Sequence, residues 1–345
     1  MTSPFKIDDP VRIGVIGCGY WGPNIIRNLV NNPDCSIQFI CDRNPERLDY
    51  ARSTFKGVPT TQNQEDVLSH GGINAVVIAT ELQSHYQLVK ETLLRGKNVF
   101  VEKPLAATVS ECRELIELSE KKKLTLLVGH TYLYNPAVNL IRNYIKNGDL
   151  GEIYYITSQR LNLGRVRKDA NVMWYLAPHD ISMILYWLED LPIRIKAHGY
   201  SYLRKDLEDV IFLDLEFSQG TSAHVQSSWL NPNKIRKMSI VGSKKTIIYD
   251  DMSSDSKLQI YDKGISRANI QDHLGGYDNF GKFQLIQRAG DIFVPKIDFI
   301  EPLSLECQDF IDSIKQKRKP ISDAITGLNV VKILELAQES LKKNI

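Results

Sequence analysis

A glycine-rich turn near the start of the chain constrains the fold more than any other stretch. It follows an apolar, β-branched run and precedes a proline, in the order Val11-Arg12-Ile13-Gly14-Val15-Ile16-Gly17-Cys18-Gly19-Tyr20-Trp21-Gly22-Pro23. This order predicts a strand, a tight turn and a helix start. In such a turn Gly17 permits the bend, Gly19 lets a ligand approach the backbone, and Gly22 lets the helix pack on the strand. The free N–H groups of the helix N-terminus then form a binding position for a diphosphate.

An acidic residue after the second apolar run indicates which dinucleotide the turn binds. Asp42 follows Ser36–Cys41, about 20 residues beyond the turn. A carboxylate at this position accepts hydrogen bonds from the adenosine ribose and repels a 2′-phosphate, which favours NAD. The neighbouring Arg43 could pair with a 2′-phosphate, so NADP stays open. We predict that the three glycines, Tyr20, Trp21, Asp42 and Arg43 bind NAD; a purely structural turn is the alternative.

Bulk composition narrows the class of protein. A length of 345 residues favours two domains, and 43% apolar with 24% charged residues is typical of a soluble globular protein. A net charge of +2 gives no reason to expect nucleic acid or a membrane as a partner. Five cysteines without C-x-x-C spacing argue against a zinc site or a disulfide framework. With no predicted signal peptide or membrane span, we expect a cytoplasmic protein.

Strands alternate with helices over the first 130 residues. Beyond Asp42 the pattern predicts helices at 45–55, 84–94 and 108–122, the second capped by Ser84, and strands at 75–80, 98–101 and 125–129. Alternation with right-handed crossovers indicates a doubly wound parallel sheet. We therefore predict an α/β Rossmann domain at residues 1–130.

The remaining residues, 131–345, are predicted to form an α+β domain. After a helix at 135–147, strand-like runs occupy 153–159, 193–200, 210–217, 221–229, 237–241 and 245–249. Short turns such as Ser218-Gln219-Gly220 join several of them, so we expect an open, mostly antiparallel sheet. Residues 253–295 are expected to be irregular, and helices at 304–317 and 324–342 are free to pack back on the first domain. One sheet face needs cover, which favours a homodimer or homotetramer formed through it.

Two residues are candidate catalytic groups. Lys103 lies in Glu102-Lys103-Pro104 at a strand end, where open α/β sheets bind ligands, and Pro104 restrains its backbone. His179 follows Pro178, which is predicted to begin a helix reaching Asp190. Near a helix N-terminus an imidazole stays neutral and available as a base. A solvated lysine and a capped polar histidine are the structural alternatives.

A polar segment upstream of His179 supplies candidate substrate ligands. Its arginines, Arg160, Arg165 and Arg167, carry planar groups that match phosphate and carboxylate oxygens. A solvated face is the alternative for such a charge cluster. We predict substrate contacts from Arg160, Asn162, Arg167, Asn171, Trp174 and Asp180.

These landmarks together resemble the Gfo/Idh/MocA oxidoreductases over nearly the whole chain. The glycine turn is followed by Thr80 and His85, then by Glu102-Lys103-Pro104, by Gly129 to Asn135-Pro136, and by a distant His179. The stretches Arg160-Leu161-Asn162-Leu163-Gly164 and Leu176-Ala177-Pro178-His179-Asp180 are most similar to the branch acting on nucleotide-activated amino sugars. The resemblance implies cofactor contacts from Thr80, His85, Glu102 and Lys103.

The resemblance also implies a reaction. Lys103 and His179 flank a sugar carbon while hydride passes between that carbon and the nicotinamide. An ammonium stabilises a developing alkoxide, and an imidazole suits proton transfer at neutral pH. Two residues depart from the family pattern, Tyr175 in place of Asp and Glu81 in place of Pro. Because a phenol prefers to donate a hydrogen bond, Tyr175 is expected to assist catalysis and to favour ketone reduction.

Three classes of function remain in competition, and the first of them has two variants. The leading one is NAD(P)-dependent oxidation or reduction at C3 of a nucleotide-activated amino sugar in polysaccharide or glycan biosynthesis. A 3-ketoreductase of a deoxysugar or cyclitol pathway is its nearest alternative. A dinucleotide-binding sensor without turnover is a second class, for which Tyr175 is the sequence argument. A glycosyltransferase-like enzyme would hold a metal at Asp250-Asp251, but the pair lacks D-x-D spacing and we predict no metal.

Overall fold

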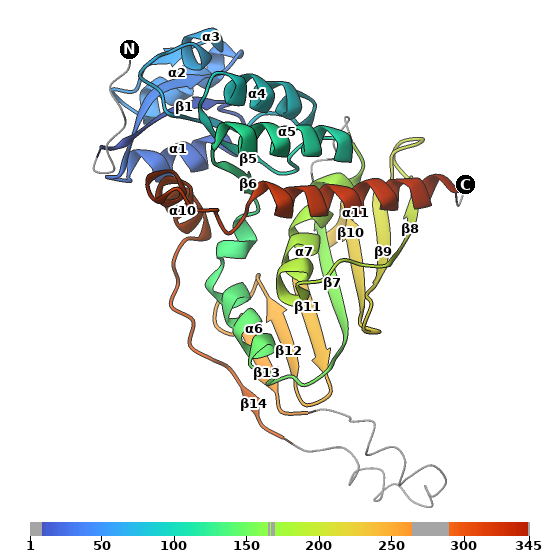
Figure 1. Ribbon diagram of the computed structural model, residues 1–345. Helices are drawn as coiled ribbons and strands as arrows, with labels where there is room; N and C mark the ends of the chain where they lie inside the picture. Colours follow the sequence, from blue (N-terminus) through green and yellow to red (C-terminus); the bar gives the residue numbers. More distant parts are fainter. Residues whose placement is uncertain (1–8, 165, 167–169, 264–289, 344–345) are drawn as a thin grey trace, which may run out of the picture. The chain divides into compact units, whose positions relative to one another are not determined.

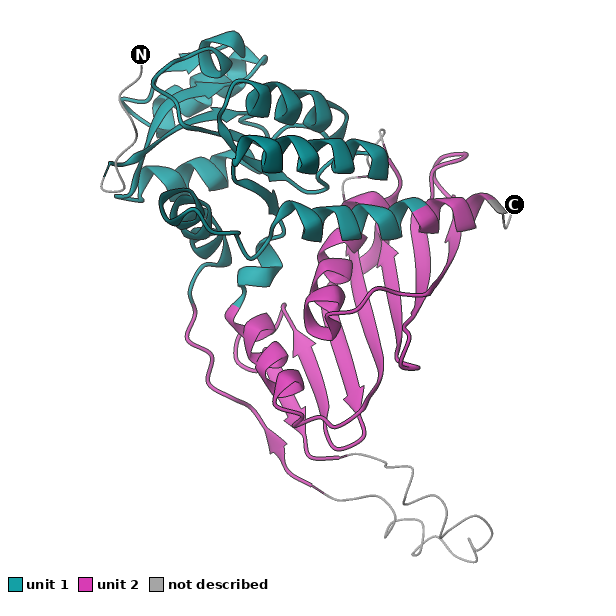
Figure 2. Cartoon of the chain, viewed as in Figure 1, with its two compact units in different colours: residues 1–135, 300–335 teal, residues 136–299, 336–345 magenta. Residues whose placement is uncertain are grey.

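Figure 1 shows the computed structural model, which describes residues 9–164, 166, 170–263 and 290–343. The chain forms two compact units, coloured separately in Figure 2. Unit 1 comprises residues 1–135 and 300–335, and unit 2 comprises residues 136–299 and 336–345. Residues 300–335 therefore belong to the first unit, whereas the sequence predicted a boundary at residue 130 and left the C-terminal helices free to pack back.

Unit 1 is built on a six-stranded parallel sheet with the order β3-β2-β1-β4-β5-β6. Its strands are β1 Val11–Ile16, β2 Cys35–Cys41, β3 Thr60–Thr61, β4 Ala75–Ile78, β5 Asn98–Glu102 and β6 Leu126–Gly129. The predicted doubly wound sheet is confirmed. The strand order reverses at β1 and β4, and the carboxyl ends of the strands meet at one edge, where such sheets bind ligands.

Helices cover both faces of this sheet. They are α1 Gly22–Val30, α2 Pro45–Thr54, α3 Glu65–Leu68, α4 Leu82–Leu94, α5 Val109–Lys122, the 3-10 helix η1 Thr131–Tyr134, α10 Pro302–Gln316 and the first part of α11 Ala324–Lys343. Alternate residues of β1, beginning with Val11, share one buried cluster with side chains of α1, α2 and α10. On the opposite face, a Cβ added to Gly14 would lie 2.4 Å from a methyl group of Val67 in α3.

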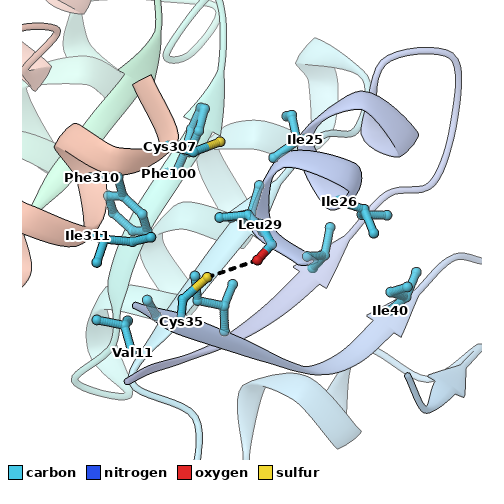
Figure 3. Packing of buried hydrophobic residues seen from close by; sticks show 14 of the residues in the cluster. Val11, Ile25, Ile26, Leu29, Cys35, Ile40, Phe100, Cys307, Phe310 and Ile311 are labelled. Carbon is cyan, nitrogen blue, oxygen red and sulfur yellow. Dashed lines mark hydrogen bonds between the residues drawn. The ribbon is translucent and has the colours of Figure 1, made fainter. Parts of the chain in front are cut away.

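Helix α10 completes the core of unit 1 although it lies near the end of the chain. It contributes Leu303, Cys307, Phe310 and Ile311 to the cluster shown in Figure 3. The rings of Phe310 and Phe100 meet edge to face with centroids 5.7 Å apart. Aromatic side chains bury the largest apolar areas, so this contact is a major link between α10 and the sheet.

The helix starts in unit 1 were predicted with mixed success. The predicted helix at 108–122 is confirmed as α5, and Thr108 caps it in a capping box with Glu111. The predicted cap of α4 is wrong, because α4 begins at Leu82 and its N-cap Glu81 makes no side-chain capping bond. Ser84 lies inside the first turn and donates its hydroxyl proton to the carbonyl of Glu81 at 2.8 Å.

Unit 2 is built on an eight-stranded sheet with the order β14-β13-β12-β11-β7-β10-β9-β8. Its strands are β7 Ile153–Leu163, β8 Arg194–Tyr200, β9 Val210–Glu216, β10 Ser222–Ser228, β11 Leu230–Gly242, β12 Thr246–Asp250, β13 Leu258–Tyr261 and β14 Ile292–Phe293. Among these strands β7 and β10 pair parallel and the other neighbours pair antiparallel. The predicted open, mostly antiparallel sheet is confirmed. Strands β13 and β14 fall in the segment expected to be irregular, where the pairing of β13 with β12 and of β14 with β13 outweighs weak local propensity.

The helices of unit 2 are α6 Pro136–Lys146, α7 Val172–Leu188 and the end of α11. The indole N–H of Trp187 in α7 donates to the carbonyl of Val138 in α6 at 3.0 Å. The end of α11 is fastened to β8, since Ser340 Oγ accepts the N–H of Ala197 at 3.0 Å. Among the helices of the described residues, none combines the length and the apolarity needed to cross a membrane.

The predicted start of α7 is wrong. Asn171 is the N-cap, and its side-chain oxygen accepts the N–H of Trp174 at 3.4 Å. Pro178 lies inside the helix, where it removes one backbone donor. His179 is therefore about two turns from Val172, the first residue of α7. The electrostatic field of the helix N-terminus decays within the first turn, so it does not reach His179.

Candidate active site

The turn between β1 and α1 requires glycine at two of the three glycine positions of its G-x-G-x-x-G motif. Gly17 has φ +102°, and a Cβ on it would lie 2.4 Å from the carbonyl oxygen of Ala79. A Cβ on Gly22 would lie 2.3 Å from the carbonyl oxygen of Gly17. A Cβ on Gly19 would meet only the tip of Arg47, at 3.5 Å. Gly19 is thus open to a ligand, and α1 begins with no side-chain cap on its N–H groups, so the turn fits a diphosphate.

Asp42 is buried at the end of β2 and holds this turn. Its Oδ2 accepts the N–H of Cys18 at 2.8 Å, and its Oδ1 accepts the N–H of Asn44 at 2.9 Å. The guanidinium of Arg47 lies 3.5 Å from Oδ2. Sequence reasoning missed Arg47, whose only signal is its place in the helix that follows Asp42. The predicted contacts Tyr20 and Arg43 are both exposed beside the turn.

The glycine turn and the Glu102-Lys103-Pro104 motif are neighbours at the edge of the sheet. The side chain of Trp21 interacts with the carboxyl group of Glu102, and the N–H of Lys103 donates to Glu102 Oε2 at 3.3 Å. Burial raises the pKa of Glu102 to about 7, against the smaller opposing effect of the Lys103 charge. The structure therefore brings the turn, Glu102 and Lys103 together at the carboxyl edge of the sheet.

His85 connects two loops at that same edge. Its Nδ1 lies 2.8 Å from the carbonyl oxygen of Pro104, and its Nε2 lies 3.1 Å from that of Thr80. Burial lowers the pKa of His85. A neutral imidazole has one N–H, so it donates to one of these carbonyls at a time. His85 thereby holds the loops after β4 and β5, on which Thr80 and Lys103 lie.

Two buried groups near Glu102 were missed. His130 follows β6, Glu306 comes from α10, and both are fully buried. The hydroxyl of Thr131 donates to Glu306 Oε2 at 2.7 Å. Burial lowers the pKa of His130 to about 3 and raises that of Glu306 well above its usual range. No local sequence pattern identifies either residue, because a tertiary contact between η1 and α10 places them near Glu102.

In unit 2, two predicted substrate residues bind each other. The Nε of Arg160 donates to Asp180 Oδ2 at 2.8 Å, and its Nη2 donates to Oδ1 at 3.0 Å. Their exposed fractions are 4% and 1%. This two-point ion pair joins β7 to α7, and it favours a structural role for both side chains.

The start of α7 is fastened by two more of the predicted residues. Asn171 donates to Glu208 Oε2 at 2.7 Å and to Gln338 Oε1 at 2.9 Å. The indole of Trp174 donates to the same oxygen of Gln338 at 3.2 Å. These contacts position α7. They use side-chain N–H groups of Asn171 and Trp174, which the sequence predicted to bind the substrate.

The remaining predicted residues of unit 2 lie on α7 and at the end of β7. Tyr175 and His179 are half-buried on α7, and the ring centroid of Tyr175 lies 6.1 Å from that of Trp229. Asn162 lies near the end of β7. Arg165 and Arg167 fall outside the described residues.

In the acidic pair Asp250-Asp251, Asp251 lies close to two cationic side chains. Asp251 lies 3.4 Å from the guanidinium of Arg236 and 3.7 Å from the ammonium of Lys257, and it accepts the hydroxyl proton of Tyr249 at 3.1 Å. Over the described parts of the chain, no group of three or more His, Cys, Asp or Glu side chains could hold a metal ion. The five cysteines are buried and free.

Comparison with known proteins places these features in a family. The sequence matches the oxidoreductase family Gfo/Idh/MocA, NAD-binding Rossmann fold, over residues 11–130, and its C-terminal alpha/beta domain over residues 142–344. An uncharacterised oxidoreductase of Streptococcus pneumoniae is 24% identical over 222 residues, which span 60% of each chain. The UDP-N-acetylglucosamine 3-dehydrogenase of Acidithiobacillus ferrooxidans is 24% identical over 322 residues, 93% of this chain and 94% of that protein.

The fold is also shared with solved structures. The WlbA dehydrogenase from Bordetella pertussis, in complex with NADH and UDP-GlcNAcA, has a TM-score of 0.80 at 20% identity, covering 99% of this chain and 98% of that one. The two family matches together cover both units, including the glycine turn, Glu102-Lys103-Pro104 and α7. The chain therefore belongs to the Gfo/Idh/MocA oxidoreductase family, and its first unit matches the NAD-binding Rossmann fold of that family.

Proposed function

We propose that this oxidoreductase transfers hydride between NAD and C3 of a nucleotide-activated amino sugar. The observation that carries the proposal is the pair of contacts made by His85. They join the loop after β4, which packs against the glycine turn at Ala79, to the Glu-Lys-Pro motif. The choice of sugar is supported by the similarity to the Acidithiobacillus UDP-N-acetylglucosamine 3-dehydrogenase over nearly the full length of both proteins. The UDP-GlcNAcA bound in the WlbA dehydrogenase supports the same class.

In the proposed oxidation, NAD accepts the hydride from C3 and the hydroxyl proton passes to His179. The ammonium of Lys103 stabilises the negative charge that develops on the oxygen, and the phenol of Tyr175 donates a hydrogen bond to it. Reduction of a ketone runs the same steps in reverse. A Tyr at position 175 favours this second direction, because it supplies a donor and cannot accept a proton near neutral pH.

Single-turnover hydride transfer, followed by nicotinamide absorbance, tests these roles. We expect Lys103→Met and His179→Asn each to slow transfer by about a hundredfold or more, the usual size of a general acid–base contribution. Tyr175→Phe should slow it less. Lys123→Met, at an exposed lysine after α5, is the matched control and should leave the rate unchanged. Unchanged rates for Lys103→Met and His179→Asn would refute the assignment.

Mass spectrometry of ligands that co-purify with the full chain would identify the sugar without a guessed substrate. We expect a UDP-linked or dTDP-linked amino sugar together with NAD. A deoxysugar or cyclitol would favour the 3-ketoreductase alternative. Measurable NAD binding without turnover of any nucleotide sugar would favour the sensor.

We also propose that a second copy of the chain covers the open sheet of unit 2. Tyr155 of β7 and Phe212 of β9 are opposite Ser222 and Gln226 of β10, so all four side chains share one face. Tyr155 and Phe212 are 41% and 40% exposed. Light scattering should report a dimer or tetramer, and Phe212→Glu should weaken it by placing a charge on this face.

A further inference from the structure

Four buried polar atoms of unit 1 have no hydrogen-bond partner among the described residues. They are Glu102 Oε1, Glu306 Oε1 and both ring nitrogens of His130. Buried polar atoms in native proteins are nearly always paired, with protein or with ordered water. Four such atoms on three side chains therefore call for a common explanation.

Three observations show that these side chains form one cluster. Glu102 is paired with Gly129 across β5 and β6, and its carboxyl atoms lie 3.1 Å from the position of a Cβ on Gly129. His130 is the next residue, and Thr131 after it donates to Glu306. The charge of Glu102 acts on Glu306, and the charge of Lys103 acts on His130. The cluster thus lies at the carboxyl ends of β5 and β6, beside the residue that precedes Lys103.

The hydrogen-bonding capacities of the four atoms are complementary. Burial raises the pKa of Glu306, and Thr131 occupies its Oε2, so Oε1 carries the proton and donates. Burial lowers the pKa of His130, so its ring is neutral, with one donor nitrogen and one acceptor nitrogen. Glu102 Oε2 already accepts the N–H of Lys103, which leaves Oε1 as an acceptor. Two donors therefore face two acceptors.

We propose that Glu306 and His130 are positioning residues for Glu102. A chain of hydrogen bonds, bridged by buried water, runs from the Glu306 acid through His130 to the Glu102 carboxylate and holds that carboxylate beside Lys103. The chain itself is a property of unit 1, and only its effect on turnover rests on the proposed function. Besides the three members themselves, the titratable and charged groups that face the cluster are Lys103, His85, Tyr134, Cys307, Asp309 and the Arg318 paired with Asp309.

Infrared spectroscopy of the full chain tests the proposal without substrate or cofactor. In mildly alkaline buffer, above the pKa of Glu102, we expect the carbonyl band of one protonated carboxylic acid, lost in Glu306→Gln. Glu301→Gln is the matched control, because Glu301 is on the surface at the start of the same helix and is ion-paired with Arg27. The band should persist in that variant. Absence of the band from the unmodified protein, or its survival in Glu306→Gln, would overturn the proposal.

The pH profile of hydride transfer provides the second test. Glu306→Gln keeps a donor and an acceptor, so we expect a rate within about twofold of the unmodified protein and an unchanged profile. Glu306→Leu and His130→Phe break the chain and should each slow transfer by about tenfold, the loss expected for one charge-assisted hydrogen bond. Their acidic limb should move to higher pH, because Glu102 then loses a donor that stabilises its charge.

The outcomes separate the two hypotheses. If Glu306→Gln and Glu306→Leu give the same rate and the same profile, the cluster is merely structural and the positioning role is refuted. If no form of the protein transfers hydride, the proposed function fails while the infrared result still decides whether the chain of hydrogen bonds exists.

Discussion

In unit 2 the buried side chains of Arg160 and Asp180 bond to each other at two points, whereas unit 1 buries two acids and a histidine with four unpaired atoms. Opposite charges in two-point contact satisfy each other and need nothing further. Carboxyl and imidazole groups buried together are unfavourable unless protons, water or a ligand satisfy their hydrogen-bonding atoms. The difference teaches that a buried ion pair points to structure, and that an incomplete polar cluster beside a ligand-binding edge points to function.

Breaking the ion pair of unit 2 should produce the largest effect. Asp180→Ala leaves the Arg160 guanidinium buried without its counter-charge, so we expect the free energy of unfolding to fall by about 3 to 5 kcal/mol. Urea denaturation of the full chain measures this loss. The double variant Arg160→Met with Asp180→Leu should recover most of it, because an apolar pair has no charge to desolvate. A loss no larger than that of a surface pair would contradict the structural role.

The cluster of unit 1 should appear instead as two opposing pH dependences. The pKa of His130 is lowered from 6.5 to about 3, so its contribution to stability is present above pH 6.5 and is lost as the pH falls toward 3. The pKa of Glu102 is raised from 4.5 to about 7, so its contribution is present below pH 4.5 and is lost as the pH rises through 7. In the shared window each slope reaches at most about 1.4 kcal/mol per pH unit. The slope of His130 opposes that of Glu102, and Glu306, whose pKa burial also raises, adds a slope of the same sign as Glu102.

Substitutions should separate the opposing slopes. In His130→Asn the slopes of Glu102 and Glu306 remain, both of the same sign, and the free energy of unfolding should fall with rising pH across the window. In the double variant Glu102→Gln with Glu306→Gln only the His130 slope remains, and stability should fall with falling pH. Urea denaturation at a series of pH values measures both, and variant curves parallel to that of the unmodified protein would contradict the assignment.

A smaller effect should distinguish two glycines of unit 1. A Cβ on Gly129 would lie 3.1 Å from the Glu102 carboxyl group, so Gly129→Ala should lower the free energy of unfolding by about 1 kcal/mol. Gly19→Ala meets only the end of Arg47 and should unfold like the unmodified protein, yet lose NADH affinity because its methyl group faces the ligand. Denaturation and NADH fluorescence titration of both variants measure these effects. Unchanged stability of Gly129→Ala would contradict the position of Glu102, and unchanged NADH affinity of Gly19→Ala would contradict the position of the ligand.

The smallest effect provides the baseline for the comparison. Arg194 and Glu216 of unit 2 form an ion pair at 3.3 Å, with 61% and 45% of their side chains exposed. Glu216→Gln should change the free energy of unfolding by less than about 1 kcal/mol, and added salt should reduce the change further. Thermal unfolding at two salt concentrations measures it.

Local patterns were sufficient for the parts of the molecule whose contacts are close in sequence. The glycine spacing, the apolar runs of β1, β4 and β5, and the helical periodicity of 108–122 all depend on neighbouring residues, and the structure agrees with them. The start of α7 was mistaken because two local signals competed, a proline typical of first turns and an asparagine cap, and the asparagine prevailed.

The contacts that connect distant segments could not be predicted in the same way. Trp21 reaches Glu102, Thr131 reaches Glu306, and Arg160 reaches Asp180 only after the sheets have formed. A helical pattern reveals that Glu306 lies on a helix, but it does not reveal which neighbour its carboxyl group meets. The motifs therefore identified the segments of unit 1 that meet at the carboxyl edge of the sheet, while the buried groups behind them became visible only in three dimensions.

The late position of α10 in the chain has a consequence for biosynthesis. During translation the strands of unit 1 leave the ribosome long before Phe310 and its neighbours are made. Until then, the part of the sheet face that α10 covers stays exposed. At about 5 to 20 residues per second, that interval lasts on the order of ten seconds or more. We expect chaperones to meet this protein mainly through that face, and the nascent first domain to become protease-resistant only once α10 has emerged.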